Sequence, residues 1–307
     1  MTIPAPTPEQ IEQLERVAVL GAGGQLGSDL VAEFTRLGID TAGFTREALD
    51  VTDRGELEHQ LGKGRFTHVI NCAALTNVDR CEAEGEAAYS VNTIGAYLPA
   101  AVCAATNTHY TLISTDFVFD GEKGSPYVED DTPNPLNIYG ASKLAGEQGA
   151  RIANPQSLIL RISSVFGPRG SRGKGGNFVE TILARALAGD PLRVVDDIAM
   201  APTFTLHVAR ALPHLLAPQP RGIVHLTNSG SCTWYEFADE ILNQANAPRN
   251  LERIRSSELN QPARRPAYSV LATKRLEELV GFQLPSWQVA LQEYLAVTGR
   301  THLKEQQ

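Results

Sequence analysis

The chain has 307 residues, of which 42% are hydrophobic and 20% charged, a balance typical of a soluble globular protein with one or two domains. Its formal net charge is −8 and its pI is about 5.4, which argues against nucleic acid bound through general basic charge and against an anionic membrane surface. No apolar run approaches the ~20 residues of a membrane span, so we expect neither nucleic acid nor membrane among the partners.

The start of the chain and the cysteines indicate the compartment. Residues 1–10 contain three prolines and lack the apolar segment of a signal peptide. Cys72, Cys81, Cys103 and Cys232 show neither paired zinc spacing nor disulfide-rich density. We therefore expect a cytoplasmic protein with reduced cysteines, and burial of Cys72 and Cys103 in apolar segments.

A glycine-rich turn follows the first buried strand, which the pattern places at residues 17–20. Gly21, Gly24 and Gly27 are spaced three apart and lead into a helix expected over residues 25–37. Glycines permit a tight turn and let backbone N–H groups approach a pyrophosphate at the helix N-terminus. Because the turn follows a strand and opens a helix, we interpret it as dinucleotide-binding rather than as a plain structural turn.

The end of the second strand, expected over residues 39–44, bears on the choice of cofactor. An NAD-preferring site usually has an acidic residue there, against the ribose 2′-hydroxyl. This chain has Thr45 and Arg46 instead, and Asp40 lies at the opposite end of the strand. Arg46 could bind a 2′-phosphate through two hydrogen bonds, although a solvated loop charge is the alternative. We predict NADPH as cofactor, with NADH also used.

Two further segments are expected beside the cofactor. Asp50 opens the next helix and could lie near the adenine, whereas Asp53 is interpreted mainly as a helix cap. The strand expected over residues 67–70 is followed by small residues that leave room for a cofactor at the sheet edge, namely Cys72, Ala73 and Ala74.

A hydroxyl, a phenol and an amine are expected to meet at that edge. Thr115 follows a strand over residues 109–114, and Tyr139 and Lys143 lie four apart, on one face of a helix. A lysine ammonium near a phenol lowers a pKa that is otherwise ~10, so Tyr139 could exchange a proton with a sugar or alcohol oxygen. Such a pair is more commonly a solvated helix face. With the glycine turn and Thr115, however, it predicts proton transfer to a carbonyl held against a nicotinamide.

The alternation of strands and helices predicts an α/β fold: a doubly wound parallel sheet with a smaller α/β substrate-binding lobe. We assign residues 1–162 and about 191–230 to the dinucleotide-binding domain, and about 163–190 with 231–307 to the substrate lobe. Asn92 is expected to support the structure by bonding to backbone. The other expected elements are helices at 7–15, 82–103, 178–188, 205–216, 234–244 and 274–295, and strands at 157–162, 194–196 and 222–226.

Basic residues in the second half could bind a diphosphate. The segment 168–177 contains four glycines together with Arg169, Arg172 and Lys174. It could order over a diphosphate or remain a solvated loop, and both alternatives stay open. Arg265 offers a guanidinium group for phosphate oxygens.

These residues resemble the extended short-chain dehydrogenase/reductase family over nearly the whole chain. The matching motifs are Gly21-x-x-Gly24-x-x-Gly27, Asn71-x-Ala73-Ala74 and Tyr139-x-x-x-Lys143. The resemblance implies a Rossmann fold and places Thr115, Tyr139 and Lys143 at the catalytic positions.

A narrower resemblance is to the dTDP-4-dehydrorhamnose reductases, which reduce a 4-keto sugar with NADPH or NADH. The matching segments are Gly24-Gln25-Leu26-Gly27, the run Ser-Thr-Asp-Phe-Val-Phe-Asp-Gly at 114–121, Gly176-Asn177-Phe178-Val179 and Arg265-Pro266-x-Tyr268-Ser269. Phe117 stands where related dehydratases carry the glutamate needed to eliminate water, which disfavours dehydration. Val165 stands where these reductases usually carry an aromatic residue, so the exact sugar is left open.

The resemblance implies reduction of the 4-keto group of a dTDP-linked deoxysugar, dTDP-4-dehydro-L-rhamnose to dTDP-L-rhamnose. Tyr139 would give the proton, Lys143 would lower the Tyr139 pKa and hold the nicotinamide ribose, and Thr115 would polarise the carbonyl. Predicted cofactor contacts are Gly21, Gly24, Gln25, Leu26, Arg46, Asp50, Val51, Cys72, Ala73, Ala74, Tyr139 and Lys143. Predicted substrate contacts are Thr76, Asp116, Val165, Asn177 and Arg265.

Two alternatives to this function are kept. One is a reductase for another nucleotide-linked keto sugar, and the other is a non-catalytic regulatory subunit of the same fold, against which the intact Thr115, Tyr139 and Lys143 argue. Some members of the family dimerise with Mg²⁺, so a homodimer is a partner that the resemblance allows. The sequence has no acidic cluster that requires a metal, and we predict no metal site.

Overall fold

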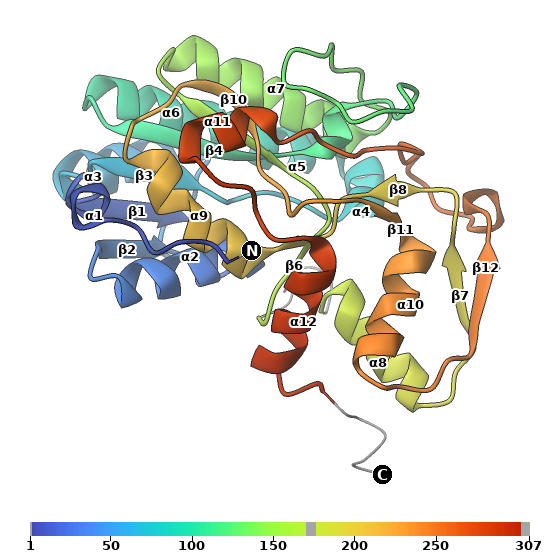
Figure 1. The fold of residues 1–307 in the computed structure, drawn as a ribbon. Coiled ribbons are helices and arrows are strands. Elements are labelled where there is room, and N and C mark those ends of the chain that lie inside the picture. Colours follow the sequence, from blue (N-terminus) through green and yellow to red (C-terminus); the bar gives the residue numbers. More distant parts are fainter. Residues whose placement is uncertain (1, 170–175, 302–307) are drawn as a thin grey trace.

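A six-stranded parallel sheet forms the centre of the larger lobe (Figure 1). Neighbouring strands pair in parallel throughout this sheet. In the computed structural model, which describes residues 2–169 and 176–301, the strands follow one another across the sheet as β10 (Gly222–His225), β5 (Leu158–Ile162), β4 (His109–Thr115), β3 (His68–Asn71), β1 (Arg16–Leu20) and β2 (Asp40–Phe44). The predicted doubly wound parallel sheet is therefore confirmed.

The order of the strands reverses next to β1. From β1 the chain passes outward to β2, and it then crosses back to β3 on the other side of β1, with β4 and β5 following outward. In open sheets of this kind, ligands bind outside the carboxyl ends of the strands at such a switch point. The segments that follow β1, β3 and β4 are therefore the ones that can line a site.

Helices cover both faces of the sheet and enclose a core on each side (Figure 1). The helices of the first core are α2 (Gln25–Arg36), α9 (Thr205–Leu216) and α11 (Lys274–Val280). Those of the second are α3 (Arg54–Gly64), α6 (Gly95–Ala105) and α7 (Ile138–Ala153). The short α1 (Pro8–Glu12) is capped by the Thr7 hydroxyl and ends before the predicted residue 15.

The smaller lobe, in the lower part of Figure 1, has a core of its own. Its elements are α8 (Phe178–Leu187), β7 (Leu192–Val195), α10 (Trp234–Gln244), β12 (Leu251–Ile254) and α12 (Trp287–Val297). Leu192, Val194 and Met200 belong to this core, so the predicted assignment of residues from about 191 onward to the dinucleotide domain is wrong for this stretch. Conversely, Leu276 of α11 packs in the larger lobe, although 231–307 was predicted for the smaller one.

Several short elements connect the larger ones. They are β6 (Val165–Phe166) paired with β9 (Thr203–Phe204), β8 (Ala199–Met200) paired with β11 (Cys232–Thr233), and the 3₁₀ helices η2 (Asp116–Val118) and η4 (Ser256–Glu258). The predicted strand at 194–196 corresponds to β7, which pairs with β12 outside the six-stranded sheet.

The single helix predicted over residues 82–103 is wrong, because the structure divides this stretch. Its parts are α4 (Val78–Ala83), α5 (Gly85–Tyr89), a π-helical turn η1 (Ser90–Ile94) and α6. Glu84, with φ −121° and ψ 52°, lies outside the helical region and separates α4 from α5. Within η1, the Asn92 side chain accepts a hydrogen bond from Leu75 N at 2.8 Å and donates one to Leu75 O at 3.1 Å. Its predicted supporting role is confirmed.

The continuous tail helix predicted over 274–295 is also interrupted. Gly281, which has a φ of +79°, ends α11 in the left-handed conformation that glycine adopts without strain. A new helix, α12, begins after Ser286, whose hydroxyl caps it.

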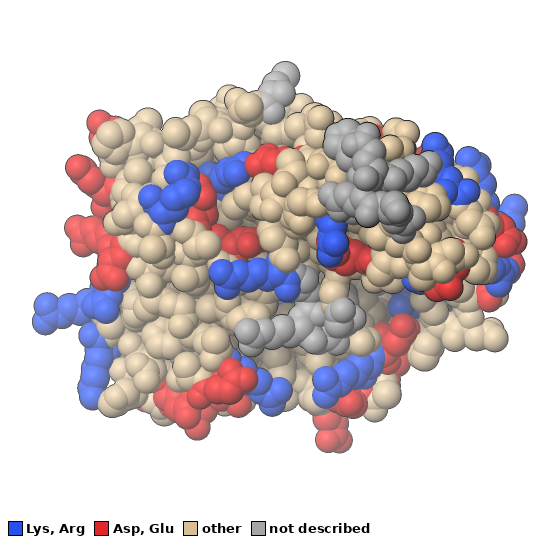
Figure 2. Space-filling model, turned by 90° about the horizontal axis from the view of Figure 1, so that it is seen from below, with Lys and Arg blue, Asp and Glu red and all other residues tan. Residues whose placement is uncertain are grey.

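The thiols and the surface charges are distributed as follows. The thiols of Cys81, Cys103 and Cys232 are buried, and Cys72, predicted to be buried, is half-buried. Acidic and basic side chains are interspersed on the face shown in Figure 2 rather than gathered by sign. Within the described ranges, every helix is too short or too polar to cross a membrane.

Two buried histidines make stability depend on pH. His68 and His109 begin the neighbouring strands β3 and β4, with ring centroids 5.2 Å apart. Burial, with a smaller effect of His109, lowers the pKa of His68 to about 4. As pH falls from the unfolded value near 6.5 toward about 4, the unfolded chain binds protons before the folded one, so stability is lost in that window.

For His68 alone, we expect the free energy of unfolding to fall by about 2 kcal/mol between pH 7.5 and 5. Urea unfolding at the two pH values measures this loss, and His68→Asn should reduce it by about that amount. An equal loss in the wild type and the variant would contradict the assignment.

Candidate active site

The glycine turn after β1 fits against its neighbours so closely that side chains are excluded. Gly21 has a φ of +74°, and a Cβ built on it would lie 2.7 Å from Ala73 N. A Cβ on Gly27 would lie 2.4 Å from Gly21 O. Because the obstructing atoms belong to the backbone, neither position accepts another residue without moving the turn. Gly24 is exposed and caps α2, and its Cβ would meet only Gly21 O, at 3.2 Å.

The residues around this turn fit a dinucleotide. Gly24 gives α2 no side-chain cap, so the first backbone N–H groups of this helix remain available to a pyrophosphate. Gln25 is 8% exposed, and its Oε1 lacks a hydrogen-bond partner among the described residues. A buried acceptor of this kind costs free energy unless it is satisfied. Leu26 is buried behind the turn.

The other predicted cofactor residues lie at the ends of β2 and β3. Arg46 is exposed in the turn after β2. The Asp50 carboxylate accepts hydrogen bonds from Thr52 N and the Thr52 hydroxyl, which lower its pKa, and the Arg46 charge lowers it further. Asp53 caps α3 by accepting from Glu56 N, as expected. The cofactor contacts of Arg46 and Asp50 stay predictions.

The segment after β3 is held by Asn71. Asn71 Oδ1 accepts from Ala73 N at 3.0 Å, while Nδ2 donates to Gly95 O at 2.8 Å. Val51 packs against Gly95, where a Cβ would come within 2.7 Å of Val51 Cγ2. The next residues along the chain are half-buried, namely Cys72, Ala73 and Ala74. Burial raises the pKa of the Cys72 thiol to about 12, against the opposing effect of Lys143.

The catalytic helix α7 is placed against β4 by close backbone packing. Asn137 Oδ1 caps it by accepting from Gly140 N at 2.8 Å. A Cβ on Gly140 would lie 2.1 Å from Phe117 O, so only glycine allows this approach. The Tyr139 ring meets the Phe117 ring edge to face at 5.8 Å, and the Tyr139 hydroxyl is hydrogen-bonded to Thr115. The structure thus brings the predicted phenol and hydroxyl together.

The environment of Tyr139 differs from the expectation. Burial raises the pKa of Tyr139 above its ordinary value; the Thr115 hydrogen bond lowers it in part, and the Asp116 charge raises it. The prediction that Lys143 lowers the Tyr139 pKa is therefore wrong for this structure, because desolvation dominates and the Lys143 ammonium donates elsewhere. A raised pKa keeps the phenol protonated at neutral pH, which suits a proton donor.

Lys143 is buried behind the site. It is 2% exposed, and its Nζ donates to Ile113 O at 2.6 Å. Burial lowers the pKa of Lys143 to about 8, and the Glu147 charge opposes this effect. The ammonium therefore carries its charge at neutral pH.

Asp116 lies beneath Thr115 and binds hydroxyl groups. Its carboxyl is 2% exposed, accepts from the Thr115 hydroxyl at 3.1 Å and accepts from the Ser163 hydroxyl at 2.8 Å. Burial raises the pKa of Asp116, against those hydrogen bonds and one from Ser269. The structure thus makes Asp116 a support for Thr115, and its contact with substrate stays a prediction.

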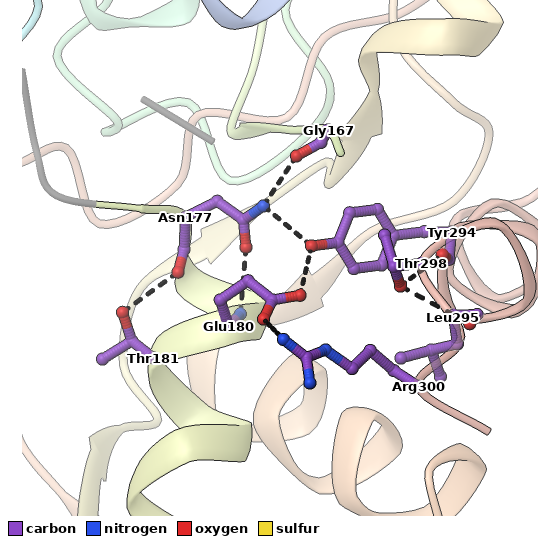
Figure 3. A network of polar contacts seen from close by, with 8 residues as sticks. All are labelled: Gly167, Asn177, Glu180, Thr181, Tyr294, Leu295, Thr298 and Arg300. Atoms are coloured by element: carbon purple, nitrogen blue, oxygen red, sulfur yellow. Dashed lines mark hydrogen bonds and ion pairs between the residues drawn. The ribbon is translucent and has the colours of Figure 1, made fainter. Parts of the chain in front are cut away.

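Asn177 lies in the network drawn in Figure 3. Its Oδ1 accepts from Glu180 N and caps α8, and its Nδ2 donates to Gly167 O at 2.9 Å and to the Tyr294 hydroxyl at 3.0 Å. The Tyr294 hydroxyl in turn donates to Glu180, which also pairs with Arg300. Both amide hydrogens of Asn177 are engaged within the protein, and its predicted substrate contact is not tested by the structure.

Three other predicted substrate residues occupy different surroundings. Arg265 donates to Asp79 Oδ2 and to Ala263 O, both at 2.8 Å, so a phosphate would compete with these acceptors. Thr76 is half-buried just before α4, and Val165 is half-buried in β6, paired with Thr203. Their substrate contacts stay predictions. Arg172 and Lys174 lie outside the described residues.

A buried ion pair next to Lys143 was missed at the level of sequence. Glu147 and Arg161 are 2% and 1% exposed, and two hydrogen bonds join them. A charged residue within the apolar strand 158–162, and an acidic residue four positions after Lys143, were the available signals. Within residues 2–169 and 176–301, histidine, cysteine and acidic side chains form no group of three able to hold a metal.

Comparison with known proteins gives consistent matches. The family model described as the RmlD substrate binding domain matches residues 15–299. The spore coat polysaccharide biosynthesis protein SpsK of Bacillus subtilis is 40% identical over 92% of this chain and 97% of its own length. The dTDP-4-dehydrorhamnose reductase of Mycobacterium tuberculosis H37Rv is 34% identical over 92% of this chain and 93% of its own.

A solved structure agrees in fold as well as in sequence. The dTDP-4-dehydrorhamnose reductase of Bacillus anthracis, in complex with NADP, superposes with a TM-score of 0.89 at 34% identity. The match covers 93% of this chain and 100% of that one.

Proposed function

Because the chain belongs to the RmlD substrate binding domain family, we infer that it is an NAD(P)H-dependent oxidoreductase that reduces the 4-keto group of a dTDP-linked deoxysugar. The reaction proposed is the conversion of dTDP-4-dehydro-L-rhamnose to dTDP-L-rhamnose. One observation supports it most directly: the Tyr139 hydroxyl is hydrogen-bonded to Thr115 on the carboxyl edge of the sheet that also carries the glycine turn.

The larger lobe would hold the dinucleotide. The uncapped N-terminus of α2 would receive the pyrophosphate, the unsatisfied Gln25 Oε1 would accept a hydrogen bond, and Arg46 would face a 2′-phosphate. When bound, NADPH would supply the hydride. NADPH is the first choice, because it is the reduced form of the NADP found with the Bacillus anthracis relative. NADH is the second.

The side chains of this protein would then carry out the proton transfer. Tyr139, which burial keeps protonated, gives its proton to the oxygen that develops from the carbonyl. The Thr115 hydroxyl, which donates its one hydrogen to Asp116 in the structure, would turn it toward that oxygen when the substrate is bound. The buried Lys143, whose ammonium is charged at neutral pH, would hold the nicotinamide ribose, as the family resemblance implies. The smaller lobe would bind the nucleotide sugar, with Thr76, Val165 and Arg265 as candidate contacts.

The proposal is tested by following NADPH oxidation with purified protein and dTDP-4-dehydro-L-rhamnose generated in situ. We expect cofactor consumption that depends on the sugar nucleotide, and dTDP-L-rhamnose as the product. Turnover by the protein alone would exclude a non-catalytic regulatory subunit. Absence of turnover with every 4-keto sugar nucleotide would overturn the proposal.

A second candidate is the reduction of a different nucleotide-linked keto sugar, such as a precursor of an antibiotic sugar. The half-buried Val165 favours it, because this position offers a smaller apolar surface than the aromatic residue of the reductases it resembles. Values of kcat/KM over a panel of keto-sugar nucleotides would separate the two candidates. A homodimer stays a prediction, which light scattering of the purified protein would test.

Arg46→Ala is expected to weaken the preference for NADPH. Removing an exposed guanidinium that faces a 2′-phosphate should raise the KM for NADPH about tenfold and leave that for NADH nearly unchanged. Steady-state kinetics with both cofactors would show this. Arg54→Ala is the matched control, because Arg54 is an exposed arginine paired with Glu58 on the surface of α3. An unchanged ratio in Arg46→Ala would exclude the proposed role.

A further inference from the structure

A fully enclosed ion pair lies one helical turn beyond Lys143. Glu147, on the same face of α7 as Lys143, receives Arg161 Nε on Oε1 at 2.9 Å and Arg161 Nη2 on Oε2 at 2.7 Å. The two side chains are 2% and 1% exposed. A charge pair so deeply buried is costly to desolvate and adds little to stability by itself. Its position beside the catalytic helix face therefore calls for another explanation.

This pair connects the catalytic helix to the catalytic strand. Glu147 Oε1 also accepts from the Ser114 hydroxyl at 2.5 Å. Ser114 precedes Thr115 on β4 and lies opposite Arg161 across the β4–β5 pairing. One turn earlier on α7, Lys143 Nζ reaches Ile113 O. The contacts of Glu147 and Lys143 together set the position of α7 relative to the strand that carries Thr115.

Glu147 also influences the charge state of Lys143. Burial works against a charged Lys143, and the carboxylate of Glu147 is the largest opposing influence, followed by Cys72. Tyr139, on the same helix, stays neutral because burial raises its pKa. On the far side of the pair, His225 of β10 is neutral as well, because burial and the Arg161 charge lower its pKa to about 3.

We propose that Glu147, clamped by Arg161 and Ser114, is a positioning residue that keeps the Lys143 ammonium charged and seated against the Ile113 carbonyl. It acts through Lys143 and touches neither substrate nor cofactor. The inference rests on the proposed function for its catalytic consequence, whereas the state of Lys143 can be measured without turnover.

Glu147→Gln removes the carboxylate charge at nearly constant volume. We expect the pKa of Lys143 to fall by about one unit. A ¹⁵N NMR titration of the Lys143 amine, in the protein without substrate, would measure this change. The Lys143→Met variant would assign the signal. In the reductase assay, the basic limb of the kcat pH profile should move down by the same amount. Turnover at pH 8 should fall by about fivefold, and recover in part at lower pH.

Three further variants separate this electrostatic effect from loss of packing. The double variant Glu147→Gln with Arg161→Gln removes both buried charges. It should therefore restore much of the stability while the shift of the Lys143 pKa persists. If the single variant does not fold, the Lys143 titration is measured in this double variant. Ser114→Ala loses one hydrogen bond and keeps the charges, so the Lys143 titration should stay in place. Glu293→Gln is the matched control, because it breaks a carboxylate pair with Arg210 and His207 away from the site.

The outcomes are distinct. An unchanged Lys143 titration in both Glu147→Gln proteins, or an equal shift in Glu293→Gln, would overturn the proposal. A shift confined to the single variant would assign the effect to the unpaired Arg161 and would also overturn it. If no keto-sugar nucleotide is reduced, the proposed function fails, and the NMR titration still decides the role of Glu147.

Discussion

Replacing Tyr139 by phenylalanine is expected to lower turnover by about 10²–10⁴-fold and to leave NADPH affinity nearly unchanged. The variant keeps the ring that packs on Phe117 and loses the hydroxyl that is hydrogen-bonded to Thr115. The oxygen of the reduced carbonyl then lacks the proton that the Tyr139 hydroxyl would donate. Single-turnover kinetics, with NADPH binding measured by fluorescence titration, would separate the chemical step from binding.

Tyr97→Phe is the matched control for this change. Tyr97 is 37% exposed on α6 and packs beside Gly149, ten residues after Tyr139 on α7, so its hydroxyl should be dispensable. Turnover of Tyr139→Phe within about threefold of the wild type would show that another group donates the proton, and the mechanism proposed above would be abandoned.

Gly27→Ala is expected to weaken NADPH binding by about two orders of magnitude or more. The added Cβ would lie 2.4 Å from Gly21 O and 3.0 Å from Ala22 Cα, so the turn itself must move. A displacement near 1 Å at a site that positions a reactant commonly costs about 10²-fold. Calorimetric titration with NADPH measures this loss, and thermal unfolding of the protein alone shows whether the fold is kept.

Gly62→Ala is the control for adding a methyl group to a helix. Gly62 lies in α3, and a Cβ there would meet nothing within 4 Å. Alanine should stabilise this helix by about 0.5–1 kcal/mol relative to glycine, with no effect on NADPH binding. If Gly27→Ala binds NADPH as the wild type does, the glycine turn is not the pyrophosphate site.

The sequence predicted those features that depend on short stretches of chain. The glycine turn follows a strand and opens a helix, and the spacing of Tyr139 and Lys143 places them on one helix face. The alternation of strands and helices implied a parallel sheet, whose carboxyl edge gathers ligand-binding residues whatever the details of packing. For this reason the position of the candidate site could be inferred before its geometry was known.

The interruptions of the helices were harder to predict from the sequence. Gly85 was an available signal for the break at Glu84. The π-helical turn η1, in contrast, accompanies contacts with distant segments, such as those of Asn92 with Leu75 and Ser142. The boundary near 191 failed for a related reason. Apolar residues such as Leu192 fit either core equally well, and only the completed fold shows which one they join.

What the sequence alone determined about this protein is the class of fold, the edge of the sheet where ligands belong and the residue types that meet there. What only the tertiary structure decided is the state of those residues: the protonated Tyr139, the engagement of Arg265 with Asp79, and the pairing of Glu147 with Arg161 behind Lys143. The physical reason is that periodicity and turn chemistry act between neighbours along the chain. Desolvation and ion pairing depend instead on which distant segments, such as β5 and α7, pack together.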